Sequence, residues 1–298
     1  MATLLIHDFP EGFYFGIDFN IWQIGPKFKG VSNIPVGPHL IFSSATEMET
    51  RSSRFITFSE DVVLIEMRWS KDTEQLKVVC ECESGERNEY LLRQFLANLG
   101  PYPDDQAAVW RRHAEFLDSA VLSSIQPVNK IGISSDPQGP SLFWSEIPKV
   151  KNNADASALS MAHVDKSSIL NFLLQRVDGF CLVSELHVSF LLFFIGQNFS
   201  ALEQWKRVFS LFSQCPRAAE EQTAVYEFLG KSICMQIELL PSDFLIDPLT
   251  EYSIVGVAMA DLLEIANLPM LEEVIVRKFG KNWRDLALPD EDLPTIVD

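Results

Sequence analysis

The sequence predicts an α+β protein with two domains: a β-rich N-terminal domain of sandwich or barrel type with two helices, followed by an all-helical C-terminal domain. Three observations support this fold class. In the first half of the chain, apolar residues alternate with polar ones over short runs, as on half-buried strands. In the second half they recur about every 3.6 residues, as on amphipathic helices. Between the halves lies a segment that is rich in Asn, Ala, Ser and Asp and poor in large apolar residues, which indicates a linker.

These changes in pattern divide the chain into four segments. Residues 1–148 form the predicted β-rich domain, 149–164 the linker, 165–285 the helical domain and 286–298 an acidic C-terminal tail. A chain of 298 residues is long enough for two domains with ordinary hydrophobic cores.

The first predicted strand lies in a run that is dense in glycine and aromatic residues. Its odd positions from 13 to 21 are all apolar, whereas Asp18 and Asn20 fall on even positions, so we expect one half-buried strand. Glycine and proline then turn the chain before a second strand at 40–42. Three further runs, with β-branched or aromatic residues between polar turns, predict strands over 54–58, 62–69 and 75–81.

Two helices and a short β-like fragment complete the predicted N-terminal domain, over residues 90–99, 105–125 and 141–144. Six helices are expected in the C-terminal domain. Asp165 or Ser167 caps the first, Ser200 and Glu203 form a capping box for the third, and Pro216 suits the first turn of the fourth. The six ranges are 165–177, 180–196, 200–212, 216–240, 253–266 and 269–279.

The charge balance restricts the kinds of partner that the chain can bind. It has 41 acidic and 24 basic residues, a net charge of −17. Such acidity repels nucleic-acid phosphates and anionic membrane surfaces, so we expect no direct nucleic-acid or membrane contact, and a basic protein is a better partner. The most apolar window, 180–195, is shorter than the ~20 residues of a membrane span and contains polar residues, which predicts a buried helix. By itself the protein is expected to be a monomer.

The five cysteines are scattered along the chain, and no secretory leader is evident at the N-terminus. Cys80 and Cys82 are the one close pair, and a single intervening residue suits neither a redox motif nor a zinc knuckle. We therefore expect reduced thiols and a location in the cytoplasm and nucleus.

Motifs for catalysis, cofactors or metals are not evident. The five histidines never fall within four residues of one another, and the glycine spacing at 25–30 lacks the Lys-Ser/Thr of a phosphate-binding loop, so we expect no metal and no cofactor. Asp18 is the most interesting carboxylate, because it interrupts an aromatic strand. A solvent-facing or turn-capping role is favoured over catalysis. His113 and His187 lie among apolar residues on helices and are expected to be hydrogen-bonded core residues, and Trp205 is expected in the core.

Several motifs together resemble those of one protein family. The N-terminal block combines Gly12-Phe, Phe15-Gly-Ile-Asp18, Trp22, Gly25-Pro-Lys-Phe-Lys-Gly-Val31, Ile34-Pro35 and Gly37-x-His39, and the middle contributes Leu99-Gly-Pro-Tyr-Pro103. The C-terminal half adds Ser184-Glu-Leu186, Phe190, Gln204-Trp-Lys206, Gln236 and Leu239-Leu-Pro-x-Asp-Phe244. On these residues the chain resembles the Aar-two splicing-factor family, whose members are assembly factors of the U-five small nuclear ribonucleoprotein.

The resemblance implies a fold and a function. The fold is a β-rich N-terminal domain joined to a helical domain similar to VHS domains. The implied function is non-enzymatic: members hold the large spliceosomal scaffold protein in a precursor particle by contacting its RNase H-like and Jab/MPN domains. They thereby delay binding of the RNA helicase, and phosphorylation releases them. The acidity of this chain agrees with a basic, RNA-handling partner.

The tail is the predicted protein-binding segment. Three acids precede a short apolar run, and this run suits addition to an exposed sheet edge of a partner; a frayed terminus is the alternative. The residues concerned are Leu293, Pro294, Ile296 and Val297. In the family a longer C-terminal extension takes part in partner binding, whereas here 281–298 alone follow the last predicted helix. The alternative function is a hydrolase whose acidic active site is assembled only by the fold.

Overall fold

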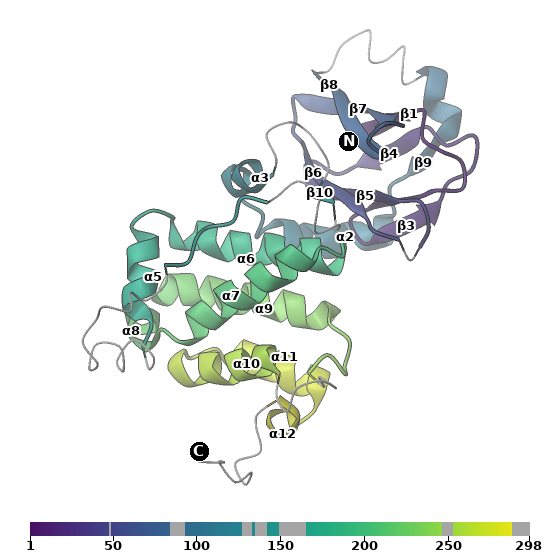
Figure 1. The fold of residues 1–298 in the computed structure, drawn as a ribbon. Coiled ribbons are helices and arrows are strands. Elements are labelled where there is room, and N and C mark those ends of the chain that lie inside the picture. Colours follow the sequence, from purple (N-terminus) through teal and green to yellow (C-terminus); the bar gives the residue numbers. More distant parts are fainter. Residues whose placement is uncertain are drawn as a thin grey trace. The chain divides into compact units, whose positions relative to one another are not determined.

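The computed structural model describes residues 1–47, 49–83, 93–126, 133–134, 142–148, 165–245 and 253–287 (Figure 1). Strands occupy the N-terminal part and helices the C-terminal part, which confirms the predicted fold class. The chain forms two compact units, and neither is continuous in sequence. Unit 1 comprises Met1–Trp144 and Leu191–Leu202, and unit 2 comprises Ser145–Phe190 and Glu203–Asp298. The predicted linker, 149–164, lies outside the described residues, so the predicted domain boundaries stay a prediction.

Unit 1 contains two five-stranded sheets, with strand orders β8-β7-β1-β4-β9 and β10-β6-β5-β2-β3. In the first sheet β1 runs parallel to β7 and antiparallel to β4, so the first residues of the chain are a central strand. The strands are β1 Ala2–His7, β2 Tyr14–Ile17, β3 Asn20–Gln23, β4 Gly30–Ile34, β5 Gly37–Ser44, β6 Ser52–Phe58, β7 Val62–Ser70, β8 Gln75–Glu83, β9 Leu99–Pro101 and β10 Ile133–Ser134.

The single strand predicted over 13–21 is wrong, because a tight turn at Asp18 and Phe19 divides it into β2 and β3. Asp18 has φ 55°, a left-handed conformation that a short polar side chain tolerates. The turn pairs Phe15 with Trp22, so these two side chains lie on the same face. Phe15 is fully buried and Trp22 packs against the same core.

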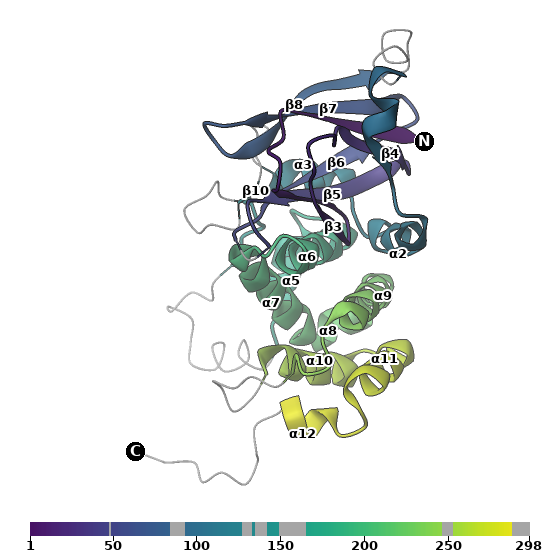
Figure 2. The same ribbon diagram turned by 90° about the vertical axis from the view of Figure 1, so that its right-hand side faces the viewer.

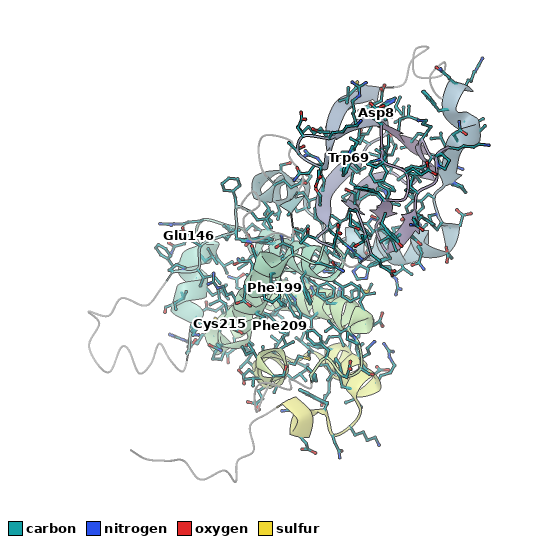
Figure 3. All side chains as sticks on the ribbon, turned by 45° about the vertical axis from the view of Figure 1, so that its right-hand side comes forward. Asp8, Trp69, Glu146, Phe199, Phe209 and Cys215 are labelled. Atoms are coloured by element: carbon teal, nitrogen blue, oxygen red, sulfur yellow. The ribbon has the colours of Figure 1, made fainter. Side chains whose placement is uncertain are left out.

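Aromatic side chains fill the core beneath the first sheet. Trp69 on β7, which Figure 3 labels among the strands, contacts the rings of Phe9 and Phe13 at centroid distances of 5.2 and 5.6 Å. Both contacts are edge-to-face, the preferred geometry for aromatic pairs. Aromatic residues from the N-terminal run and from β7 therefore contribute together to the core of unit 1.

The helices of unit 1 differ from their predicted ranges. The predicted helix over 105–125 is two helices, α2 Asp104–Ala114 and α3 Ser119–Ile125, because Asp118 accepts hydrogen bonds from the N–H groups of Ala120 and Val121 and starts a new helix. The end of the predicted helix over 90–99 is the 3₁₀ turn η1 Leu96–Asn98 followed by β9. The described part of the predicted fragment 141–144 contains no strand, since residues 142–148 have no regular secondary structure.

The regular secondary structure in the described residues of the C-terminal half is all helical. In both views α10 and α11 lie beside α12 (Figure 2). Two predictions need correction: the helix over 216–240 breaks at Gln222, and Asn198 rather than Ser200 caps α7 by accepting from the N–H of Ala201. The helices are α5 Ser167–Leu174, α6 Gly179–Phe194, α7 Phe199–Ser213, α8 Pro216–Glu221, α9 Thr223–Leu239, α10 Ile254–Ile265, α11 Pro269–Phe279 and α12 Trp283–Ala287.

Helix α6 is buried along most of its length, as predicted for this apolar window. Within the part of the chain that the structure describes, no single helix is long and apolar enough to cross a membrane. Among the helices that the structure describes, α5 and α6 are the one pair that reaches that length and composition when taken together, and they are bent by 102°.

The C-terminal end of α6 belongs to unit 1 and lies against the β5–β6 hairpin. Arg51 donates a hydrogen bond to the carbonyl oxygen of Ile195 at 2.5 Å. A Cβ atom on Gly196 would lie 2.7 Å from Ser53 Oγ, so only glycine allows this close approach. Unit 1 therefore depends on residues that follow its strands by a long stretch of sequence.

Cysteine chemistry agrees with the sequence prediction only in part. Cys181, Cys215 and Cys234 are free thiols, as expected. Cys80 on β8 is disulfide-bonded, so the prediction of a reduced thiol is wrong at this position.

Candidate functional site

The predicted protein-binding residues Leu293, Pro294, Ile296 and Val297 lie outside the described residues. Their role in binding therefore stays a prediction. Within the described part of the chain, buried polar side chains form two hydrogen-bond networks, one in each unit.

The first network is centred on Asp18, in the turn between β2 and β3. Its carboxyl group accepts hydrogen bonds from Tyr102 Oη at 2.6 Å and from the backbone N–H of Leu40 at 2.9 Å. Its Oδ2 atom also lies 2.7 Å from His39 Nδ1. The side chains of Asp18, His39 and Tyr102 are 0%, 1% and 3% exposed, respectively. The expectation of a solvent-facing acid is thus wrong, and Asp18 instead connects the turn to β5 and to the residue that follows β9.

Aromatic rings and carbonyl groups enclose the other partner in this contact, His39. The His39 ring stacks on Trp110 of α2, with centroids 6.0 Å apart and an interplanar angle of 20°. Its Nε2 atom lies 2.9 Å from the carbonyl oxygen of Pro35, and Trp110 Nε1 donates to the carbonyl of Pro38. The network therefore also attaches α2 to the second sheet.

Burial sets the electrostatics of the Asp18 network. It raises the pKa of Asp18, against the opposing influence of His39 and the hydrogen bonds. Burial and the neighbouring Asp18 raise the pKa of Tyr102, which keeps the phenol protonated as a donor. A carboxylate with no exposed surface has no access to a substrate, so the chemistry available to this network is the fixing of strands to one another.

The second network joins three helices of unit 2. Trp205 Nε1 on α7 donates to Gln236 Oε1 on α9 at 2.7 Å, and Gln236 Nε2 donates to Ser232 Oγ at 2.9 Å. His187 on α6 completes the set, with its Nδ1 atom 2.8 Å from Ser232 Oγ. All four side chains are almost completely buried, which confirms the core positions predicted for His187 and Trp205.

A neighbouring carboxylate in unit 2 holds an extended segment of the chain. Glu185 on α6 accepts hydrogen bonds from both the N–H and the Oγ of Ser145, at 3.0 and 2.7 Å, and from Gln204 Nε2 at 2.8 Å. Glu185 is 4% exposed. A buried carboxylate that accepts three hydrogen bonds fixes its donors firmly, so residue 145 is anchored to α6 and α7.

The sequence motifs quoted above supply most of these residues. Asp18, His39 and Tyr102 come from the N-terminal and middle motifs, and Glu185, Gln204, Trp205 and Gln236 from the C-terminal ones. Sequence reasoning singled out Asp18 but did not find His39 and Tyr102 as its partners. The one indication in the sequence that these three residues act together is that all of them belong to the same set of family motifs.

Groups of acidic, histidine or cysteine side chains that could hold a metal ion do not occur among the described residues. Large apolar side chains are exposed at scattered places, including Phe199 at the start of α7 (Figure 3), which is 69% exposed.

Comparisons with known proteins match both parts of the chain. Residues 1–127 match the family model described as the AAR2 N-terminal domain, and residues 144–287 match the AAR2 C-terminal repeat region. Among similar proteins named protein AAR2 homolog, one from Macaca fascicularis is 24% identical over 365 aligned positions, which cover 100% of this chain and 93% of the relative. The homolog from Homo sapiens is 23% identical with the same coverage, and that from Caenorhabditis elegans is 24% identical, covering 83% of this chain and 81% of the relative.

Proposed function

The chain belongs to the AAR2 family, and from that premise we propose that it is a non-catalytic assembly factor of the splicing machinery. The observation that supports this most strongly is the match of both domain models, which together span nearly the whole chain. The burial of the motif residues supports it too, because residues such as Asp18 and Glu185 build the scaffold instead of lining an open catalytic cleft.

The proposed partner is the large scaffold protein of the U-five small nuclear ribonucleoprotein, held through its RNase H-like and Jab/MPN domains in a precursor particle. While it is bound, the protein would keep the RNA helicase from joining. The charge of −17 supports a basic protein partner and opposes direct binding to RNA. Such a factor would act in the cytoplasm and the nucleus, as expected from the sequence.

The tail is the proposed contact with that partner. Leu293, Pro294, Ile296 and Val297 would add an extended strand to a sheet edge of the scaffold protein, with main-chain hydrogen bonds for affinity and apolar side chains for specificity. The acids before them would speed association with a basic surface. From 240 to 298 the chain has 12 acids against 4 bases, a net charge of −8.

The test is calorimetric binding of the full chain to the purified RNase H-like domain, without RNA. We expect binding that weakens at high salt, chiefly through slower association. Deleting residues 290–298 should reduce the affinity strongly, and Ile296→Asp should do so without loss of acidic charge. Asp298→Asn serves as the matched control and should bind nearly as tightly as the wild type.

Each outcome has a definite meaning. Equal affinity of the deletion variant and the full chain would remove the tail from the interface while leaving the partner in place. Absence of binding by every variant, together with absence of the scaffold protein from material purified with this chain from its own cells, would overturn the proposed function.

A further inference from the structure

The contact between Asp18 and His39 requires a proton, because both ring nitrogens of His39 face acceptors. Nε2 lies 2.9 Å from the carbonyl oxygen of Pro35, and Nδ1 lies 2.7 Å from Asp18 Oδ2. A carbonyl oxygen only accepts hydrogen bonds, so Nε2 carries a hydrogen. A neutral imidazole has a single N–H, and its Nδ1 would then point a bare lone pair at the carboxylate. Two acceptors at 2.7 Å repel each other unless a proton lies between them.

We infer that Asp18 and His39 hold one shared proton between Oδ2 and Nδ1, so that the pair is neutral in the fold and folding of unit 1 takes up this proton at alkaline pH. The proton count is the same whether the pair is described as carboxylate and imidazolium or as carboxylic acid and imidazole. A neutral pair also avoids an uncompensated charge among side chains that are 0% and 1% exposed.

None of the groups named next, which lie around the pair, gains or loses a proton at alkaline pH, so the shared proton is the one whose binding changes there. Tyr102 donates to Asp18 Oδ2, and its raised pKa keeps it protonated. On α2, burial and the nearby Arg112 lower the pKa of His113 to about 4, so His113 is neutral at alkaline pH. Trp110 and Phe58, whose rings contact His39, do not titrate. The raised pKa of Asp18 also favours retention of a proton in the pair.

The consequence is a fold that weakens as the pH rises. In the unfolded chain His39 loses its proton near pH 6.5 and Asp18 near pH 3.9, so above about pH 7 the unfolded pair holds none. The folded pair still holds one. Since the native state then binds more protons, the folding equilibrium constant falls about tenfold per pH unit, until the folded pair also loses its proton. Below about pH 6.5 the stabilisation is fully present. Loss of the shared proton would leave Asp18 Oδ2 and His39 Nδ1 as two bare acceptors facing each other, which weakens the attachment of the β2–β3 turn to β5.

The variant Asp18→Asn removes the titrating proton between residue 18 and His39 but keeps a hydrogen-bond donor to Nδ1. The amide NH₂, at the place of Oδ2, donates permanently to Nδ1 of a neutral His39, and the amide oxygen still accepts from the N–H of Leu40. Tyr102 Oη, which donates to Oδ2 in the wild type, then accepts the second amide hydrogen. Asn is also among the residues that best tolerate the positive φ at this position. The matched control is Glu66→Gln, which makes the same change at the partly exposed contact between His7 and Glu66, 3.3 Å in length.

The measurement is hydrogen exchange of the full-length protein, followed by mass spectrometry on peptides that cover residues 14–23 and 37–44, from pH 7 to 9 and corrected for intrinsic exchange. We expect the opening constant of these peptides to rise about tenfold per pH unit in the wild type and in Glu66→Gln, and to stay flat in Asp18→Asn. The same slope in Asp18→Asn as in the wild type, or a flat wild-type profile, would overturn the inference.

A second measurement covers the case in which Asp18→Asn does not fold. Nitrogen NMR of the wild-type protein at pH 8 reports the state of each ring nitrogen. A protonated or hydrogen-bonded Nδ1 at His39 supports the shared proton, and a bare Nδ1 with a proton on Nε2 alone contradicts it.

Discussion

Trp205 is the residue whose contacts define the centre of unit 2. It is 1% exposed, and its ring lies 5.4 Å from that of Phe190 and 6.1 Å from that of Phe209. The indole N–H donates to Gln236, itself completely buried. A single side chain thus fills volume and also satisfies a buried polar group, and these two contributions can be measured separately.

Replacing Trp205 should therefore destabilise unit 2 in two steps of different size. We expect Trp205→Ala to lower the free energy of unfolding by about 3–5 kcal/mol, because it leaves a large cavity. Trp205→Phe keeps most of the volume but leaves Gln236 Oε1 without its donor, which should cost about 1–3 kcal/mol. Urea unfolding followed by circular dichroism measures both. Unchanged stability with loss of partner binding would instead assign Trp205 to an interface.

His113 gives unit 1 a pH dependence on the acidic side. Burial and Arg112 lower its pKa to about 4 in the fold, against about 6.5 when unfolded. Between these values the unfolded state binds the extra proton, so stability is complete above pH 6.5 and falls as the pH drops toward 4. The full loss corresponds to about 3 kcal/mol.

This prediction is tested with His113→Gln, which lacks the titrating ring. The wild type should lose more stability than His113→Gln between pH 7 and pH 5, and a proton NMR titration of His113 should have its midpoint near pH 4. His7→Gln, at a partly exposed histidine, is the control and should follow the wild type. A midpoint near 6.5 for His113 would contradict the prediction.

At the scale of elements, the anchor between Glu185 and Ser145 attaches the segment 145–148, which belongs to unit 2, to the part of α6 that lies in the same unit. We expect Glu185→Ala to cost about 1.5–3 kcal/mol, because the N–H and hydroxyl of Ser145 lose a charged acceptor, and to raise hydrogen exchange in this segment. Glu203→Ala is the control. Glu203 is exposed and pairs with Lys206 at 3.7 Å, so its removal should cost about 0.2–1 kcal/mol. Equal protection of residue 145 in both variants would show that Glu185 is no anchor.

Periodicity in the sequence identifies elements whose two faces differ. The helices α5, α6, α10 and α11 and the strands β5 to β8 occur close to their predicted ranges, because each combines an apolar face or run with clear turn residues at its ends. The strand β1 was not predicted. Its run Ala-Thr-Leu-Leu-Ile-His is buried on both faces, so it shows no alternation.

The turn at Asp18 and Phe19 was also not predicted, and again the pattern of apolar residues explains why. The alternation of apolar residues continues through it, but a two-residue turn reverses which positions face the core, so Trp22 packs inward in place of Ile21. The same turn buries Asp18. Its partners His39 and Tyr102 come from 21 and 84 residues away, and no local pattern connects residues so distant. Most residues of the two networks thus belong to the sequence motifs, but the contacts between them could not be predicted from the sequence.

At the scale of the whole molecule, the segment 149–164 is the expected site of proteolysis. It has few apolar anchors, so limited digestion should cut there first and leave a C-terminal fragment that starts near Asp165. Because Leu191–Leu202 belongs to the same compact unit as Met1–Trp144, the two fragments should elute together in gel filtration and separate only in denaturant. Early stable fragments cut between residues 200 and 240 would contradict this division of the chain.

The contribution of Leu191–Leu202 to unit 1 also sets an order of events during synthesis. Nascent chains emerge N-terminus first, and many domains fold before the next one has been made. Here the strands of unit 1 are complete long before Ile195 and Gly196 leave the ribosome, so Arg51 has no carbonyl to bind and Ser53 lacks its covering helix. The nascent β-sheets must wait until α5 and α6 have been translated. Until then the β5–β6 hairpin stays uncovered, and we expect slow translation just after residue 202 to favour correct folding over aggregation.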